Sequence, residues 1–206
     1  MIEINIEKKL NMYNGGQSIK FSGRFPLHMV TKITGPSGAG KTTLLKIIAG
    51  LITSESGRIS VNGSIWLDTE REINLPPQKR LAGFVFQDYA LFPNMTVLQH
   101  LQYATKDAEW INRLLNIAEL TTFADHKPIH LSGGQQQRLA VVRALAIKPK
   151  LVLMDEPFSA LDSKTKSRFL PALNILFEEI KTTAVIVSHY PMELDVFTGN
   201  EISMGE

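Results

Sequence analysis

The sequence predicts an α/β fold with a parallel sheet, and three observations support that prediction. A glycine-rich segment at residues 35–43, GPSGAGKTT, follows a short β-branched run, VTKIT, and precedes a stretch with apolar residues at helical spacing. A second apolar run, LVLMDEP at residues 151–157, is typical of a strand that is buried on both faces of a parallel sheet. Between the two, residues 93–149 place apolar residues three and four positions apart, which predicts helices inserted into the α/β chain.

Length and composition favour a single globular domain. The 206 residues are enough to bury a full core. The formal net charge of +2, without a long Lys/Arg block, argues against a nucleic acid as partner. The absence of cysteine excludes a disulfide framework and any cysteine-based metal site or nucleophile. No run of about 18 apolar residues occurs, so no membrane-spanning helix is predicted, and the N-terminus lacks the unbroken apolar core of a secretory signal.

The first part of the chain reads as strands. Ile2, Ile4 and Ile6 alternate with polar residues, which predicts a strand at residues 1–9, and after a turn at Asn14-Gly15 the chain returns as a second strand at residues 18–27. We expect this antiparallel hairpin to lie beside the strand at residues 30–34.

The remaining elements follow from turn residues and apolar period. Asn62-Gly63 predicts a second hairpin over residues 58–68, because this dipeptide favours a two-residue hairpin turn. The elements expected after it are a loop at residues 70–80, a buried strand at 81–86, three helices within 93–149, a helix at 163–181, a strand at 182–189 and a short helix at 192–197. One domain, residues 1–206, is therefore expected: 1–92 and 150–206 form the α/β core with its antiparallel part, and 93–149 form a helical subdomain.

The glycine-rich segment fits the phosphate-binding loop pattern G-x-x-x-x-G-K-[ST] without a mismatch. Its glycines allow a tight turn with several N–H groups aimed at one point, where the helix N-terminus adds partial positive charge. Lys41 is expected to reach the β- and γ-phosphates of a nucleotide, and the Thr42 hydroxyl to bind the bridging Mg²⁺. The alternative is a glycine-rich turn with a solvated lysine. The expected nucleotide-binding residues are Gly35, Pro36, Ser37, Gly38, Ala39, Gly40, Lys41, Thr42 and Thr43.

Five further stretches follow in a fixed order: Gln87 at a strand end, LSGGQQQR at 131–138, LVLMDEP at 151–157, SALD at 159–162, and His189 at the end of a strand. In this order they resemble the ATP-binding cassette (ABC) family, the ATPase subunits of membrane transporters. The resemblance covers nearly the whole chain, and LSGGQ distinguishes this family from other phosphate-loop enzymes. It implies an ABC ATPase fold with ATP and Mg²⁺ as cofactors.

The LSGGQ segment has a physical interpretation beside the resemblance. Ser132 is a helix cap, and Gly133 and Gly134 leave N–H groups free at a helix start, which makes a second anion site. On its own such a segment is usually only a cap. The resemblance implies that Ser132, Gly133, Gly134 and Gln135 bind the γ-phosphate of ATP held by a second copy of the chain, and that Asp162 couples the two sites.

The acidic pair and His189 are the expected reactive groups. Asp155 suits a Mg²⁺-supporting carboxylate at the end of its strand. By resemblance Glu156 is the catalytic base that polarises water, and His189 holds the γ-phosphate and the attacking water. Gln87 completes the metal shell, so the expected metal ligands are Thr42, Gln87 and Asp155. Without the resemblance, two carboxylates capping a helix and a packed or solvated histidine are the ordinary alternatives.

One aromatic residue is a candidate for the adenine base. Tyr13 lies at the first hairpin and is the one aromatic there that could stack on adenine. A tyrosine that packs only on its neighbours in the turn is an equal alternative.

The segment DYALFPNMTV at 88–97 places Tyr89, Leu91, Phe92, Pro93 and Met95 among loop signals. Such apolar residues form either subdomain core or a groove for a partner. LFPNMTV resembles the importer branch, in which this region receives a short helix of the integral membrane permease subunit. The implied location is peripheral, on the cytoplasmic face of the membrane, with an extracytoplasmic substrate-binding protein as an indirect partner.

Within importers, INLPPQKRLAGFVFQD at 73–88 and FLPALN at 169–174 look like the ATPase of molybdate importers. Sulfate, iron, polyamine and sugar importers share most of these features. The sequence stops at Glu206, before the small regulatory β-domain that many molybdate and sugar importer ATPases carry, so we expect a minimal member or a truncated chain.

Other classes of ABC protein fit less well. Soluble ABC ATPases of DNA repair or translation usually carry two cassettes or a long coiled coil, which this sequence lacks. A non-catalytic nucleotide-binding regulator is expected to lack Glu156 or His189, and both residues are present. A cassette of lipid or lipoprotein export would carry fused transmembrane segments or act with a partner that has large periplasmic domains. This sequence shows no fused segment and leaves such a partner open.

Overall fold

The computed structural model describes residues 1–10 and 17–205, which form two five-stranded sheets with a helix between them and further helices on the far side. The antiparallel sheet has the order β2-β1-β4-β5-β6, and the parallel sheet has the order β10-β3-β9-β8-β7. The strands of the first are β1 Ile2–Leu10, β2 Gln17–Phe25, β4 Ser56–Val61, β5 Ser64–Asp68 and β6 Ile73–Asn74. Those of the second are β3 Val30–Thr34, β7 Gly83–Val85, β8 Leu151–Asp155, β9 Thr183–Val187 and β10 Gly199–Ser203.

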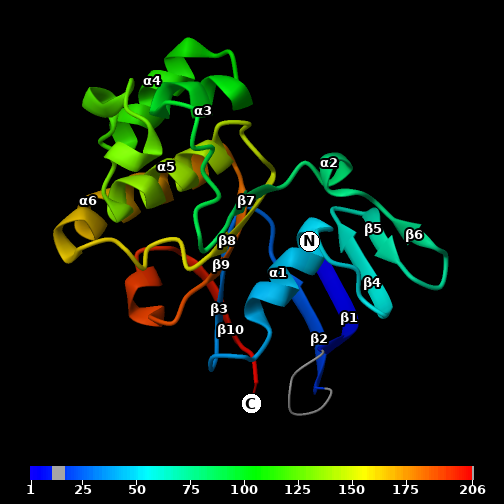
Figure 1. The fold of residues 1–206 in the computed structure, drawn as a ribbon. Helices are drawn as coiled ribbons and strands as arrows, with labels where there is room; N and C mark the ends of the chain where they lie inside the picture. Colours follow the sequence, from blue (N-terminus) through cyan, green and yellow to red (C-terminus); the bar gives the residue numbers. More distant parts are fainter. Residues whose placement is uncertain (11–16, 206) are drawn as a thin grey trace.

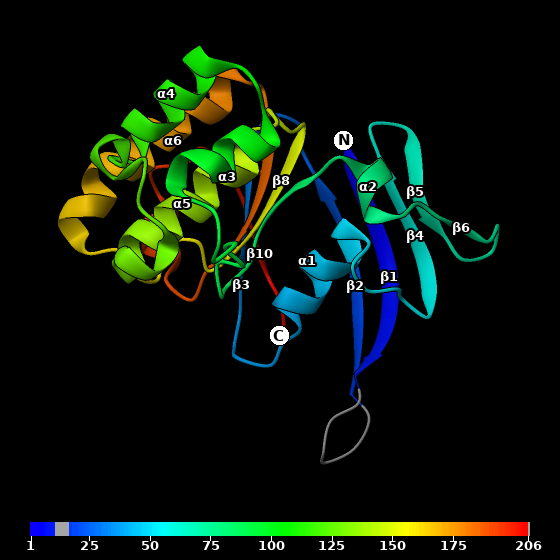
Figure 2. The ribbon, with the colours of Figure 1, turned by 45° about the horizontal axis from the view of Figure 1, so that its top comes forward.

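Helix α1, Lys41–Ala49, lies between the two sheets, as Figures 1 and 2 both show. It is apolar on several sides, and a helix with that pattern needs cover on more than one face. Leu44 and Ile48 are fully buried in one cluster with Ile4 of β1 and Leu153 of β8. This packing fixes α1 against the strand ends from which the candidate site is built.

The helical layer covers the other face of the parallel sheet (Figure 2). Its helices are α3 Val97–Ala104, α4 Ala108–Ile117, α5 Gly133–Leu145 and α6 Ser163–Glu179, with short 3₁₀ turns at Thr121–Phe123 and Pro128–His130. Leu139 and Val142 of α5 are buried in one core with Val152 and Met154 of β8. Side chains therefore alternate along β8 between this core and the core around α1.

The first hairpin does not lie beside β3, so that expectation was wrong. β1 pairs with β2 and β4, in a sheet separate from β3. The alternation of Ile2, Ile4 and Ile6 gives β1 one apolar face, and that face packs on α1. A layer of helix consequently separates the hairpin from the parallel sheet.

Several expected elements differ in extent. Residues 70–80 are not entirely loop, because they contain β6 and the short helix α2, Pro77–Arg80. The buried strand at 81–86 is confined to β7, and the helix expected at 192–197 is a 3₁₀ turn at Pro191–Leu194. The sequence did not predict β10, a short strand at the sheet edge with the partly polar sequence GNEIS. The turn at Asn62-Gly63 is confirmed, with φ of 49° and 79° as a primed hairpin turn requires.

Across the described ranges, no helix has both the length and the apolar character needed to cross a membrane.

Candidate active site

The glycine-rich loop joins β3 to α1 and has a backbone that glycine makes possible. Gly35 and Gly40 have φ of 140° and 89°. A Cβ at Gly40 would come within 2.0 Å of Ile19 Cδ1, and one at Gly35 within 2.1 Å of the Met204 carbonyl oxygen. The loop is thus packed from both sides, which holds the N-terminus of α1 in place.

Lys41 lies along this loop. Its Nζ donates hydrogen bonds to the carbonyl oxygens of Gly35 (2.7 Å) and Pro36 (2.8 Å), and the residue is 6% exposed. No carboxylate pairs with this ammonium among the ion pairs of the described residues. Its charge is therefore available to an anion bound over the loop.

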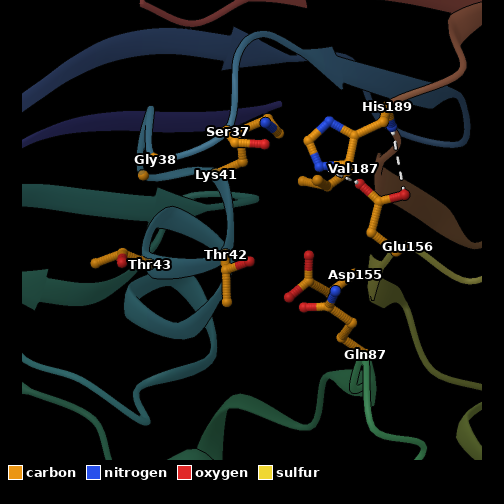
Figure 3. Close-up of a pocket in the computed structure, with 11 residues that line it drawn as sticks. Ser37, Gly38, Lys41, Thr42, Thr43, Gln87, Asp155, Glu156, Val187 and His189 are labelled. Carbon is orange, nitrogen blue, oxygen red and sulfur yellow. Dashed lines mark hydrogen bonds and ion pairs between the residues drawn. The ribbon is translucent and has the colours of Figure 1, made fainter.

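A pocket of about 440 Å³ opens at the carboxyl end of the parallel strands (Figure 3). This is the size of many small-molecule sites. It joins the loop to residues that are far away in the sequence. Its lining consists of Ser37, Gly38, Gly40, Lys41, Thr42, Thr43, Gln87, Asp155, Glu156, Val187 and His189.

Asp155 ends β8 with its side chain directed at the pocket (Figure 3). It is 2% exposed, and its Oδ1 makes no hydrogen bond within the described part of the chain. Burial raises the pKa of Asp155, although Thr42, Lys46 and Lys41 oppose the effect. An orphaned carboxylate oxygen beside a hydroxyl is suited to a cation.

Thr42, Gln87 and Asp155 also line a smaller pocket together, with Gln87 just after β7. A hydroxyl, an amide oxygen and one carboxylate are oxygen ligands of the kind that Mg²⁺ accepts in nucleotide sites, where phosphates and waters complete the octahedron. Among the described residues no group of three or more His, Cys, Asp or Glu side chains could hold a metal alone. The donor set fits a metal that arrives with a phosphate ligand.

Glu156 follows Asp155 with a φ of 50°, which is uncommon for a residue other than glycine. Its Oε1 lies 3.4 Å from His189 Nε2, and its Oε2 accepts a hydrogen bond of 3.3 Å from the His189 backbone N–H. Burial raises the pKa of Glu156, while the contacts with His189 lower it. The result is a buried carboxylate with a raised pKa, facing the pocket beside a histidine whose side chain is 44% exposed.

The LSGGQ segment, residues 131–135, is the signature segment of the resemblance described above, and it lies elsewhere, at the start of α5. Ser132 is the N-cap, as expected: its Oγ accepts from the Gln135 N–H (3.3 Å), and Gln135 Oε1 accepts from the Ser132 N–H (2.8 Å). Asp162 likewise caps α6 and accepts from the Thr165 N–H (2.9 Å). Ser132, Gly133 and Asp162 are exposed, whereas Gly134 and Gln135 are half-buried. None of these residues lines the pocket formed by the described residues.

Other expected residues have mixed outcomes. Gly35, Pro36 and Ala39 belong to the loop but do not line the pocket. Tyr13 lies outside the described residues. In the segment after Gln87, Tyr89 and Leu91 pack against the helical core, whereas Phe92 and Pro93 are exposed. That segment thus contributes both to the subdomain core and to its surface.

Sequence reasoning missed two residues at this site. Val187 lines the pocket from the end of β9. Gln137 is buried under the Glu156 main chain, to which its Nε2 donates a hydrogen bond of 2.9 Å. Three consecutive glutamines at 135–137 look alike in the sequence, and only the phase of α5 separates the buried one from the others.

Comparisons with known proteins agree with this geometry. The profile of the ABC transporter family matches residues 20–159. The chain is 39% identical over 188 residues to the molybdenum import ATP-binding protein ModC of Photobacterium profundum, covering 90% of this chain and 51% of that protein. It is 45% identical over 166 residues to ModC of Saccharophagus degradans, covering 78% and 45%. The chain spans about half the length of the curated relatives it matches.

A solved structure supports the same relationship. The dimeric post-hydrolysis structure of the ATP-binding cassette MJ0796, bound to ADP and Pi, superposes with a TM-score of 0.83 at 32% identity, covering 99% of this chain and 94% of that one. Its fold therefore matches the α/β architecture that the sequence predicted. The chain belongs to the ABC transporter family.

Proposed function

We propose that this chain is the ATP-hydrolysing subunit of an ABC importer, with molybdate as the transported oxyanion. One observation carries the proposal: a single pocket brings together the loop lysine, the Thr42 hydroxyl, Gln87, the Asp155–Glu156 pair and His189. These groups supply what phosphoryl transfer to water needs, namely phosphate binding, a metal site, a base and a positioning group. The reaction is ATP plus water to ADP plus phosphate.

The loop binds the triphosphate. Residues 35–43 offer backbone N–H groups and the N-terminus of α1, and Lys41 adds a fixed positive charge. Thr42, Gln87 and Asp155 hold Mg²⁺, and the orphaned Oδ1 of Asp155 is the observation that this cation fits. When bound, the metal neutralises developing charge on the phosphates.

Glu156 and His189 act on the water. A carboxylate whose pKa is raised is closer to the working pH, which makes it a better base than an exposed glutamate. Its contact with His189 keeps both side chains on the pocket wall, where His189 positions the γ-phosphate and the attacking water. The two residues are the catalytic residues of this proposal.

The site is completed by a second copy of the chain. Ser132, Gly133, Gly134 and Gln135 form a capped helix start, in which the Gly133 and Gly134 N–H groups take no part in the capping bonds. These residues lie outside the pocket of their own chain. In a head-to-tail homodimer they reach the γ-phosphate of the partner's ATP, and Asp162 joins the contact. The dimeric state of the related cassette MJ0796 supports this arrangement.

The remaining partners are inferred from the relatives. The names of relatives at 39% and 45% identity support molybdate uptake as the process served. The permease subunit docks on the exposed part of the segment after Gln87, at Phe92 and Pro93, which places the chain on the cytoplasmic face of the membrane. An extracytoplasmic substrate-binding protein delivers the oxyanion to the permease and not to this chain.

The test is ATPase turnover as a function of protein concentration, for the wild type and for Ser132→Arg. A site shared between two copies predicts specific activity that rises with concentration and a variant that is nearly inactive, because the arginine side chain fills the second anion site. Ser167→Arg, at an exposed position on α6, is the matched control and is expected to keep wild-type activity. Activity that is independent of concentration and unaffected by Ser132→Arg would show a self-sufficient phosphate-loop enzyme and remove the transporter proposal.

A further inference from the structure

Gln137 lies about one turn into α5 and points into the protein. The residue is 1% exposed, so its amide has given up its contacts with water. Both ends of the amide bind the loop at residues 156–160 of the same chain. Nε2 donates to the carbonyl oxygen of Glu156 (2.9 Å) and to Ser159 Oγ (3.2 Å), and Oε1 accepts from the Ala160 N–H (2.9 Å).

The orientation of this amide is fixed by its partners. Exchanging its oxygen and nitrogen would place a carbonyl against the Glu156 oxygen and an NH₂ group against the Ala160 N–H, so that both contacts become repulsive. A fully satisfied buried amide is rigid, and losing it leaves the Ala160 N–H without its side-chain acceptor, which is unfavourable in a buried position. Gln137 therefore acts as a clamp with one stable geometry.

The clamp acts on the backbone of the catalytic base. The Glu156 N–H donates to the Val187 carbonyl oxygen of β9 (3.0 Å), and the Glu156 carbonyl oxygen accepts from Gln137. The main chain of Glu156 is thus held on both sides while it adopts a φ of 50°. A residue keeps such a conformation only where its surroundings determine it.

A second observation ties the same loop to α5. A Cβ on Gly134 would lie 3.2 Å from the Ala160 carbonyl oxygen and 3.4 Å from Leu161 Cδ2. The loop therefore sits directly on the first turn of α5, one turn before Gln137. Gly134 allows this approach, and Gln137 bonds the loop in place.

We propose that Gln137 is a positioning residue for hydrolysis: it fixes the Glu156–Ala160 segment to the signature helix of the same chain. The inference rests on the proposed function, because it takes Glu156 as the base and the start of α5 as the contact with the second copy. Its consequence is a direct mechanical link. When the second ATP site engages Ser132–Gly134, the movement of α5 reaches the base of the first site through one side chain.

The test is Gln137→Met, which keeps the volume of the side chain but removes its hydrogen bonds. We expect kcat to fall by about 10- to 100-fold while the KM for ATP stays within about twofold, because the base is displaced and the phosphate loop is not. Gln136→Met is the matched control: it removes an amide from the same helix, but one that bonds the Pro128 and Leu131 carbonyls. Its kcat is expected within about twofold of the wild type.

The same substitution in the Glu156→Gln background separates positioning from general stability. If Gln137 works through Glu156, the residual activity of Glu156→Gln falls by less than about twofold on adding Gln137→Met. An equal loss in both backgrounds, or a Gln137→Met enzyme as active as Gln136→Met, would overturn the proposal.

Gln137→Glu keeps the acceptor for Ala160 and loses the donor to Glu156, and it serves the same comparison if the methionine variant does not fold. The kinetic loss is expected in this variant too, and wild-type turnover by it would equally contradict the inference. A failure of the proposed function looks different, since Glu156→Gln itself would then hydrolyse ATP at the wild-type rate.

Discussion

Asp155 and Glu156 are two carboxylates buried beside each other at the end of β8, and they reduce the stability of the nucleotide-free chain. Burial raises the pKa of both, which means that the folded chain holds their ionised forms less well than the unfolded chain does. An acid with a raised folded-state pKa makes the protein lose stability as pH rises from the ordinary value, 3.8 for Asp155, through the raised one. Above that window the loss is complete, and a neutral side chain would avoid it.

Asp155→Asn is therefore expected to raise the melting temperature of the nucleotide-free chain at about pH 7.5, by about 2–4 °C for each kcal/mol recovered. The increase should shrink at a more acidic pH, because the raised pKa lets the folded wild-type chain take up the Asp155 proton more readily than the unfolded chain does. Thermal unfolding at the two pH values, without nucleotide or metal, measures the difference. The same variant should lose Mg²⁺-dependent stabilisation by ATP, which the wild type gains by binding. A lower melting temperature at both pH values would show that the Asp155 charge is favourable in the folded chain.

At the scale of the element, α1 is held at both ends. Its N-terminus faces the pocket, and its last carbonyls, of Ile47 and Ile48, each accept a hydrogen bond of 2.7 Å from Arg80 Nη1. Arg80 is 4% exposed and also donates to the Leu75 carbonyl oxygen and to Asn74 Oδ1, while burial lowers its pKa to about 10. Arg80 remains charged at neutral pH, and its positive charge interacts favourably with the negative, C-terminal end of the α1 dipole. Arg80 thereby joins α1 to the antiparallel sheet.

Arg80→Met should cost about 2–4 kcal/mol, because it removes the side-chain donor of the Ile48 and Leu75 carbonyl oxygens, and should lower the melting temperature by roughly 4–16 °C. Arg80→Lys restores the charge but not the fork of donors, so an intermediate loss is expected. Arg24→Met is the control, because Arg24 is exposed and has one ion pair, to Glu3, at 3.4 Å. Thermal unfolding of the three variants decides the matter. If Arg80→Met had the same melting temperature as Arg24→Met, Arg80 would not stabilise the contact between α1 and the antiparallel sheet.

Elements were predictable where one local pattern determined them. The apolar runs of β8 and β9 and the cap at Ser132 follow from the sequence, because burial on two faces and a side-chain acceptor leave distinct patterns. The cap at Asp162 was not predicted. The sheet that β1 joins and the existence of β10 depend on tertiary pairing, which alternation does not specify. In the candidate site, the residues within local motifs could be named from the sequence. Gln137 could not, because its role arises from a contact with Glu156 that only the folded chain creates.

At the scale of the whole molecule, the two halves of the proposed site lie on different layers. The phosphate loop starts α1, between the sheets, and Ser132 starts α5, in the helical layer on the other face of the parallel sheet (Figure 2). Under the proposed function, a second copy presents its signature segment to the nucleotide that lies over the loop of the first. ATP is then expected to form part of the interface, and hydrolysis is expected to remove the contact that closes the dimer.

Glu156→Gln should therefore trap the closed state. The variant keeps Lys41, Thr42 and Asp155 and binds Mg·ATP, but without the base it turns over slowly, and we expect its mass by light scattering to double when Mg·ATP is added. Adding Lys41→Ala should abolish the doubling and most of the nucleotide affinity, because the phosphate loop loses its positive charge. ADP in place of ATP should leave the Glu156→Gln chain monomeric, since no γ-phosphate reaches the second copy. A Glu156→Gln chain that stays monomeric with saturating Mg·ATP would refute the nucleotide-sandwich arrangement, and one that hydrolyses ATP at the wild-type rate would refute Glu156 as the base.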